Sequence, residues 1–180
     1  MKCLCSGRVH YSGELNTVMR SVFVVCLVLG LCAVGIARDT GFQGKWLLDK
    51  NQSNATAAIP DGLEQQIKQK GSELVIQTRW REPKNGIAPL VLLGVMITEL
   101  RLKVDGSQTN TQIGPFQAAS TTKAEGNSMT TNWQAAINGQ QITGQWTRTL
   151  SEDGKDMTLD IQQTSSEGKA DNAKLVFRRR

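Results

Sequence analysis

Apolar and polar residues alternate with a period of two along most of the chain after residue 40. In one such segment Leu74, Ile76 and Trp80 share a side, and polar residues occupy most of the other side. Successive side chains of a β-strand point to opposite faces, so this alternation predicts strands with one buried face and one wet face. We predict strands near residues 42–48, 63–69, 73–82, 95–104, 117–124, 128–136, 141–150, 156–163 and 173–179.

Short turn signals separate these segments. Asn-Gly or Asp-Gly pairs occur at 85–86, 105–106, 138–139 and 153–154, and such pairs supply the positive φ that tight hairpins need. The pattern predicts a meander of long antiparallel strands. A sheet of this size must close or split into layers to hide its edges and its apolar face. We therefore predict an all-β fold, an antiparallel up-and-down β-barrel of about eight to nine strands.

Two regions depart from the alternation. Residues 51–62 are polar and end in Pro60-Asp61-Gly62, which predicts a loop. The segment Ile87–Ile97 is apolar almost throughout. We favour a strand or loop packed on the core for it. The alternative is an apolar lip at the barrel mouth that contacts lipid or a partner.

The N-terminal region has a different pattern. Residues 21–37 form an apolar run that follows Arg20, ends in small residues and stops before Arg38. These are the parts of a secretory signal peptide, and translation from Met19 would give one of ordinary length. The alternative is an uncleaved membrane anchor, although the run is shorter than the roughly 20 residues that a span favours. We expect residues 1–37 to be the signal region, residues 38–180 to be one barrel domain, and the protein to be exported to the periplasm or the extracellular space.

Removal of residues 1–37 limits the chemistry of the domain. The four cysteines and the only histidine, His10, all lie in that region. The domain therefore lacks the usual nucleophile–base pairs, the common zinc ligands and disulfides, and most of its acids fall on outward positions or in turns. We expect a protein that is not an enzyme and has no cofactor or metal. An Asp153, Asp156 and Asp160 calcium loop is disfavoured against a hairpin turn.

Charge adds little to this picture. The formal net charge of the chain is +5, and three basic residues stand together at 178–180. Nucleic-acid-binding proteins usually carry a basic stripe interleaved with aromatic residues, and this sequence has no such stripe. We expect no nucleic-acid partner. Membrane contact is expected only through an uncleaved signal segment or through Ile87–Ile97.

The first predicted strand opens with Phe42-Gln43-Gly44-Lys45-Trp46, which resembles the Gly-x-Trp start of lipocalins and fatty-acid-binding proteins. The chain as a whole resembles a family of small exported bacterial proteins of lipocalin-like (calycin-type) build. The resemblance rests on residues 44–49, on the Asn, Ser and Pro residues that follow them, and on the segments 104–106, 120–127 and 146–155. It spans nearly all of 42–177 and implies the barrel, but no particular ligand.

This resemblance also implies a structural role for three residues. In lipocalins the indole of the Gly-x-Trp motif closes one end of the barrel, and an arginine of the last strand often lies across its ring. By analogy, Gly44 and Trp46 close the barrel here. Arg178 or its neighbour Arg179 is expected to cover the indole.

One polar residue falls on a predicted inward position. Arg148 shares a side with Trp146 and Leu150, and a buried arginine needs an anionic partner. Two interpretations remain open. Arg148 reaches the rim or pairs with an internal acid such as Glu99, or it anchors the carboxylate or phosphate of a ligand. The ligand-binding residues would then be Arg148 with Trp80, Trp133 and Trp146, although tryptophans also serve as plain core.

The favoured function is thus an exported, non-catalytic barrel that binds a small hydrophobic or amphipathic ligand, which could be anionic. The alternative is a structural or interaction protein of the cell envelope whose barrel core is filled. A sizeable internal cavity would separate the two, because ligand pockets enclose roughly 300 Å³ or more.

Overall fold

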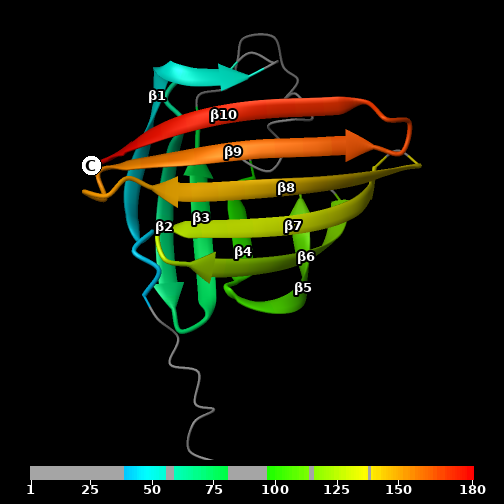
Figure 1. Cartoon of the computed structure of the whole chain (residues 1–180), viewed down its shortest axis with the longest axis horizontal. Coiled ribbons are helices and arrows are strands. Elements are labelled where there is room, and N and C mark those ends of the chain that lie inside the picture. The colour runs from blue at the N-terminus through cyan, green and yellow to red at the C-terminus, as the bar shows by residue number, and fades with distance from the viewer. Residues whose placement is uncertain (1–38, 56–58, 81–96, 114–115, 138) are drawn as a thin grey trace, which may run out of the picture. The chain divides into compact units, whose positions relative to one another are not determined.

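Ten antiparallel strands follow one another around the described part of the chain (Figure 1). The computed structural model describes residues 39–55, 59–80, 97–113, 116–137 and 139–180. They all belong to one unit, Ala37–Arg180. Within these ranges there is no helix with the length and apolar character needed to cross a membrane. The predicted signal region, residues 1–37, lies outside the described residues.

Strands that follow each other in the chain pair with each other, except β4 and β5, and β1 also pairs with β10. The strands are β1 (Gly44–Ala55), β2 (Glu64–Lys70), β3 (Glu73–Arg79), β4 (Glu99–Lys103), β5 (Asp105–Ile113), β6 (Phe116–Glu125), β7 (Ser128–Ile137), β8 (Gln140–Leu150), β9 (Asp156–Ser165) and β10 (Ala170–Arg179). The sheet order is β4-β3-β2-β1-β10-β9-β8-β7-β6-β5. The predicted all-β, antiparallel, up-and-down architecture is confirmed.

The sheet ends meet at a seam between β4 and β5. These strands follow each other in the chain and contact each other, but no backbone ladder joins them in the described residues. The Thr111 hydroxyl of β5 approaches the Arg101 carbonyl oxygen of β4 at 3.5 Å. The barrel is therefore nearly closed.

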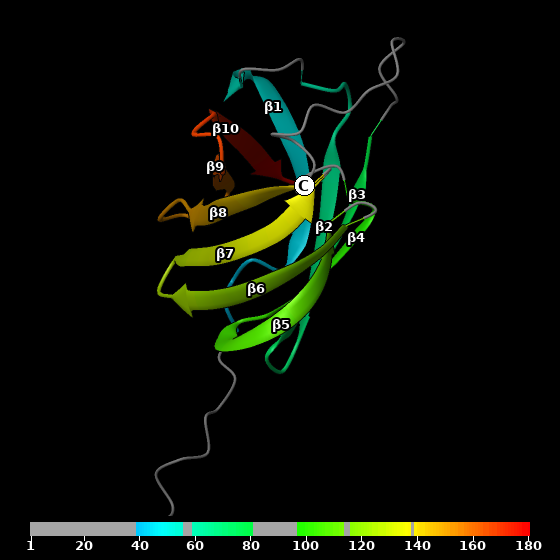
Figure 2. The same ribbon diagram turned by 90° about the vertical axis from the view of Figure 1, so that its right-hand side faces the viewer.

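Strands β2–β4 run steeply across β6–β9, as both views show (Figures 1 and 2). Apolar side chains from both groups and from β1 and β10 form one core cluster. Among its fully buried members are Trp46, Ile67, Leu74, Ile76, Leu100, Met129, Met157, Leu159, Leu175 and Phe177. The period-two alternation places these side chains inward, and their burial stabilises the fold.

The structure corrects the predicted strand count, because β5 was not expected as a strand. Its sequence, Asp105 to Ile113, is almost entirely polar. The inward positions near its end are Thr111 and Ile113, which are both buried. The inward face of this strand is partly made of hydroxyls rather than apolar groups, so a search for hydrophobic alternation passes over it.

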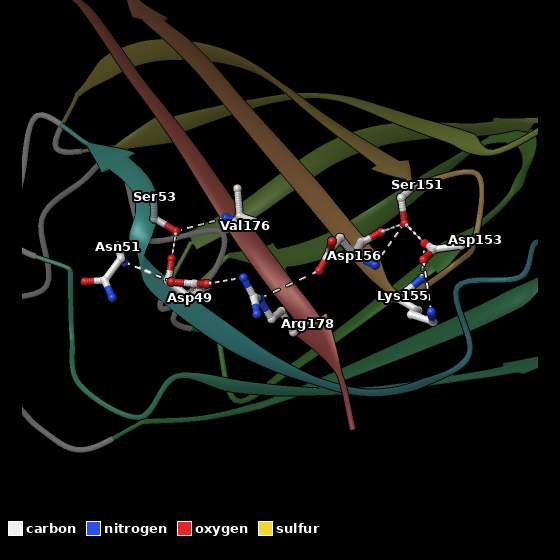
Figure 3. Close-up of polar contacts among 9 residues, drawn as sticks. All are labelled: Asp49, Asn51, Ser53, Ser151, Asp153, Lys155, Asp156, Val176 and Arg178. Carbon is white, nitrogen blue, oxygen red and sulfur yellow. Dashed lines mark hydrogen bonds and ion pairs between the residues drawn. The ribbon is translucent and has the colours of Figure 1, made fainter.

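The predicted loop at 51–62 is also corrected, since β1 continues to Ala55. Its pairing with β10 shifts register between Asp49 and Asn54. The Ser53 hydroxyl holds this irregular stretch in place. It donates to the Asp49 carbonyl oxygen at 2.7 Å and accepts from the Val176 amide at 2.9 Å (Figure 3).

Trp46 makes the cation–π contact with a last-strand arginine that the Gly-x-Trp resemblance implied. Its indole is fully buried and donates to the Phe42 carbonyl oxygen at 2.9 Å. The guanidinium carbon of Arg179 lies 4.5 Å from the ring centroid, a cation–π contact. Gly44 has a φ of 142°, and a Cβ there would come within 4 Å of both the indole and Arg179.

Arg178, the other arginine considered for this contact, has a different place. Its guanidinium lies 3.1 Å from a carboxylate oxygen of Asp49 on β1 and 4.0 Å from one of Asp156 on β9 (Figure 3). It therefore links the two strands that flank β10. Of the apolar segment Ile87–Ile97, only Ile97 lies within the described residues, and it is buried.

Candidate functional site

Strand β8 carries a buried cation into the barrel. The side chain of Arg148 is directed inward by the same alternation that buries Trp146 and Leu150, and the residue is only 1% exposed. Its direct cross-strand partners are Met129 on β7 and Leu159 on β9, and both are fully buried. The neighbours that the sheet gives Arg148 are therefore apolar.

Arg148 has no counter-charge among the described residues. Its Nε and Nη1 atoms are buried there without a hydrogen-bond partner. Burial lowers the pKa of the guanidinium to about 10, so it remains protonated at neutral pH. A buried charge normally persists only when it is paired, because desolvation costs several kcal/mol or more.

The rim position and the Glu99 pair suggested for Arg148 from the sequence are both wrong. The residue does not reach an exposed rim, because it is almost completely buried. Glu99 is not its partner either. That carboxylate lies on the outside and accepts hydrogen bonds from Gln77 and Arg101, which lower its pKa, the bond from Gln77 most.

Trp146 lies next to this cation on the same inner face, and Trp133 packs against Trp146. Trp146 is two residues from Arg148 on β8, and its ring centroid is 5.4 Å from that of Trp133. Trp133 packs over Gly144, where an added Cβ would fall 2.3 Å from the indole. The glycine thus makes room for the ring.

The two indoles resemble Arg148 in carrying a buried hydrogen-bond donor without an acceptor in the described residues. Both rings are buried, and in the described part of the chain neither Nε1–H group has an acceptor. Buried tryptophans usually find a partner for this group. The Nε2 donor of Gln163, which pairs with Gly144 across β8 and β9, is unsatisfied as well. Unpaired donors therefore follow the inner face of β8 and its neighbours.

Hydroxyl groups line the adjoining wall of the interior. Thr111 and Ser120 are 2.6 Å apart, and Thr122 and Thr131 are 2.9 Å apart, oxygen to oxygen. All four are buried. None of these four hydroxyl groups was singled out from the sequence. Some of them occupy the same alternate strand positions as Ala118 and Ile113, and this alternation was the available signal in the sequence. The signal was weak because few large apolar residues accompany them.

Trp80 stands apart from the other predicted ligand-binding residues. It follows the end of β3, is half-buried and packs against the core cluster. Within the described residues it makes no ring contact with Trp133 or Trp146. The structure thus places Trp146 in contact with Trp133 and on the same strand face as Arg148, while Trp80 takes no part in this arrangement within the described residues.

The predicted turn at Asp153 is present. Its carboxylate accepts from the Ser151 hydroxyl at 2.8 Å and from the Lys155 amide at 3.1 Å (Figure 3). These hydrogen bonds, the amide of Lys155 first, lower the pKa of Asp153. No group of three or more acidic, histidine or cysteine residues in the described ranges could hold a metal ion.

Comparison with known proteins gives the fold and little more. No family model and no curated protein matches the sequence. A secretory abundant heat-soluble protein of Ramazzottius varieornatus matches with a TM-score of 0.51 and 10% identity, over 81% of this chain and all of its own. Zebrafish ileal bile acid-binding protein in complex with cholic acid matches with 0.47 and 15%, over 78% and 99% of the two chains. Another heat-soluble protein of Ramazzottius varieornatus matches with 0.49 and 14%, over 79% and 96%. At 10% identity, the match to the first heat-soluble protein shows that the two chains share the barrel fold, and nothing beyond the fold.

Proposed function

We propose that this chain is an exported, non-catalytic binding protein whose barrel interior holds a small amphipathic anion. The observation that carries the proposal is Arg148, a guanidinium buried among apolar neighbours with no counter-charge in the described residues. Each buried unsatisfied group requires an explanation, and an absent ligand is one of the few available. A carboxylate or phosphate would supply the missing charge.

The apolar residues around Arg148 favour a ligand with an apolar body. Met129, Leu159 and the indole of Trp146 flank the cation on the inner face, and they offer contact to a hydrocarbon or ring body. The unpaired donors of Trp133, Trp146 and Gln163 would suit further acceptor atoms along that body. Export is supported by the apolar run at residues 21–37 and its small-residue ending.

A matched pair of probes tests this function. Oleate and oleyl alcohol share a chain and differ in charge, and the fluorescence of Trp133 and Trp146 should report the binding of either one. We expect Arg148→Met to weaken oleate binding by roughly 10- to 100-fold, which is the value of a charge-assisted hydrogen bond. Binding of oleyl alcohol should be unchanged.

Arg178→Met serves as the control, because this arginine is exposed on the outer face. It should leave the affinity for both probes as in the wild type. Equal loss of oleate and oleyl alcohol in Arg148→Met would show that Arg148 acts on the fold and not on the anion. A wild-type protein that binds neither probe, nor any other amphiphilic anion, would favour the filled barrel instead.

A further inference from the structure

A groove of about 520 Å³ crosses the outer face of strands β5–β9. Its walls are two rows of outward side chains that run perpendicular to the strands. The first row follows the cross-strand pairs Gln108, Thr121, Asn132, Gln145 and Gln162. The second follows Ala119, Gln134, Thr143 and Thr164. Ser120, Trp133, Gly144 and Gln163 lie between the rows. The three that carry side chains bury them inside the barrel, so the backbone forms the floor.

The walls are polar and uncharged. Apart from Ala119, each wall residue bears a carboxamide or a hydroxyl, and both groups can donate and accept hydrogen bonds. Asn132 and Gln145 bond each other at 2.8 Å, which holds two amides in fixed orientation. The charged residues nearest in register, Asp105, Lys123 and Asp160, belong to the next row along the strands. The groove is thus a neutral strip on a chain whose net charge is +5.

We infer that this groove binds a neutral, linear oligosaccharide. An anionic partner would find no counter-charge on the walls, and a hydrophobic partner would bury the wall amides and hydroxyls without hydrogen-bond partners. A neutral glycan presents hydroxyl groups that both donate and accept, which matches the amides and hydroxyls of both rows. This site is separate from the barrel interior and does not depend on the proposed function.

The dimensions of the groove suit an extended chain. Neighbouring strands lie about 4.8 Å apart, so β5 to β9 span roughly 19 Å. Residues i and i+2 on one strand are about 6.7 Å apart, which sets the separation of the two rows. The groove is therefore long and narrow. It offers a similar set of polar groups at each strand, as a polymer with a repeating unit requires.

Isothermal titration with cellohexaose and maltohexaose, beside a heparin hexasaccharide as the anionic probe, tests the inference on the complete domain. We expect at least one neutral hexasaccharide to bind and the heparin fragment not to bind. The double variant Asn132→Ala/Gln145→Ala should weaken that binding at least tenfold. Gln141→Ala, an exposed outward residue of the same strand β8 outside the groove, should leave it unchanged.

Several results would overturn the inference. These are equal or tighter binding of the heparin fragment, no binding of either neutral hexasaccharide at millimolar concentration, or an undiminished affinity in the double variant. Self-association of the protein that is lost in the double variant would assign the groove to a second copy of the chain. Oleate binding, measured in the same samples, keeps the interior site a separate question.

Discussion

Arg148 carries its charge into the interior between Met129 and Leu159, and this placement has a cost in the ligand-free protein. Burial lowers the pKa of its guanidinium to about 10, well below the ordinary value of an arginine. One pKa unit corresponds to about 1.4 kcal/mol, so the unpaired charge opposes folding by roughly 3 kcal/mol. A residue retained at such a cost is expected to act in something other than stability.

Replacement of Arg148 by methionine should therefore stabilise the ligand-free protein. The variant keeps a similar volume and removes the unpaired charge, and we expect a gain of about 1–3 kcal/mol in the free energy of unfolding. Urea denaturation followed by circular dichroism measures it.

Arg178→Met is the comparison, since an exposed arginine with partly exposed ion pairs should change stability by less than about 1 kcal/mol. A loss of several kcal/mol in Arg148→Met would contradict the interpretation. It would mean that Arg148 has a structural partner.

Sequence parity alone placed Arg148, Trp133 and Trp146 on the inner face, because a strand leaves only two choices for each side chain. It could not identify the partners of Arg148, which depend on strands distant in sequence. It also left Arg178 and Arg179 undecided. Trp46 pairs directly with Arg179 across β1 and β10, and a shift of one residue in that register would exchange the two arginines.

At the scale of the strands, the shift in register between β1 and β10 depends on one hydroxyl. Ser53 accepts from the Val176 amide and donates to the Asp49 carbonyl oxygen, and it thereby satisfies backbone groups that the shifted ladder leaves free. Val176 itself is buried, so its amide has little access to water.

We expect Ser53→Ala to destabilise the protein by about 1 kcal/mol, the usual cost of a lost hydrogen bond with a buried partner. The Val176 amide should exchange with deuterium faster, while amides in the middle of β8 stay protected. Ser128→Ala, in which an outward hydroxyl on β7 is removed, is the control. Unchanged exchange at Val176 in Ser53→Ala would show that the β1–β10 pairing does not need this hydroxyl.

The strands that the sequence analysis predicted share large apolar residues at alternate positions, which is the signal of hydrophobic burial. Strand β5 and the end of β1 lack this signal. Strand β5 turns Thr111 inward to bond Ser120, and the end of β1 is held by Ser53. Both depend on hydrogen bonds to distant strands, and local patterning carries no information on such contacts.

At the scale of the whole molecule, the closed meander follows from physical constraints that the sequence displays. Long alternating strands joined by tight turns must hide their edges and their apolar face, and closure achieves both. The seam between β4 and β5 could not be predicted, because β5 itself was not expected. The outer face could not be predicted from these constraints either. Its neutral amides and hydroxyls on β5–β9 leave a groove with its own chemistry.

The barrel joins two features with separate functions in this account. The interior combines a buried cation, indoles and apolar side chains, and the exterior presents a neutral polar strip. Trp133 and Gly144 belong to the cross-strand row that separates the interior from the outer groove. The indole packs inward over the glycine, and the backbone of the row forms part of the groove floor. The two sites are thus on opposite faces of one sheet.

Native mass spectrometry of the protein purified from the organism that makes it tests the interior site most directly. We expect the protein to retain a small anionic amphiphile that adds a defined mass, and we expect Arg148→Met, purified in the same way, to appear at its bare mass. A wild-type protein found only at its bare mass under gentle ionisation would contradict the account. Retention of the same molecule by Arg148→Met would contradict it as well.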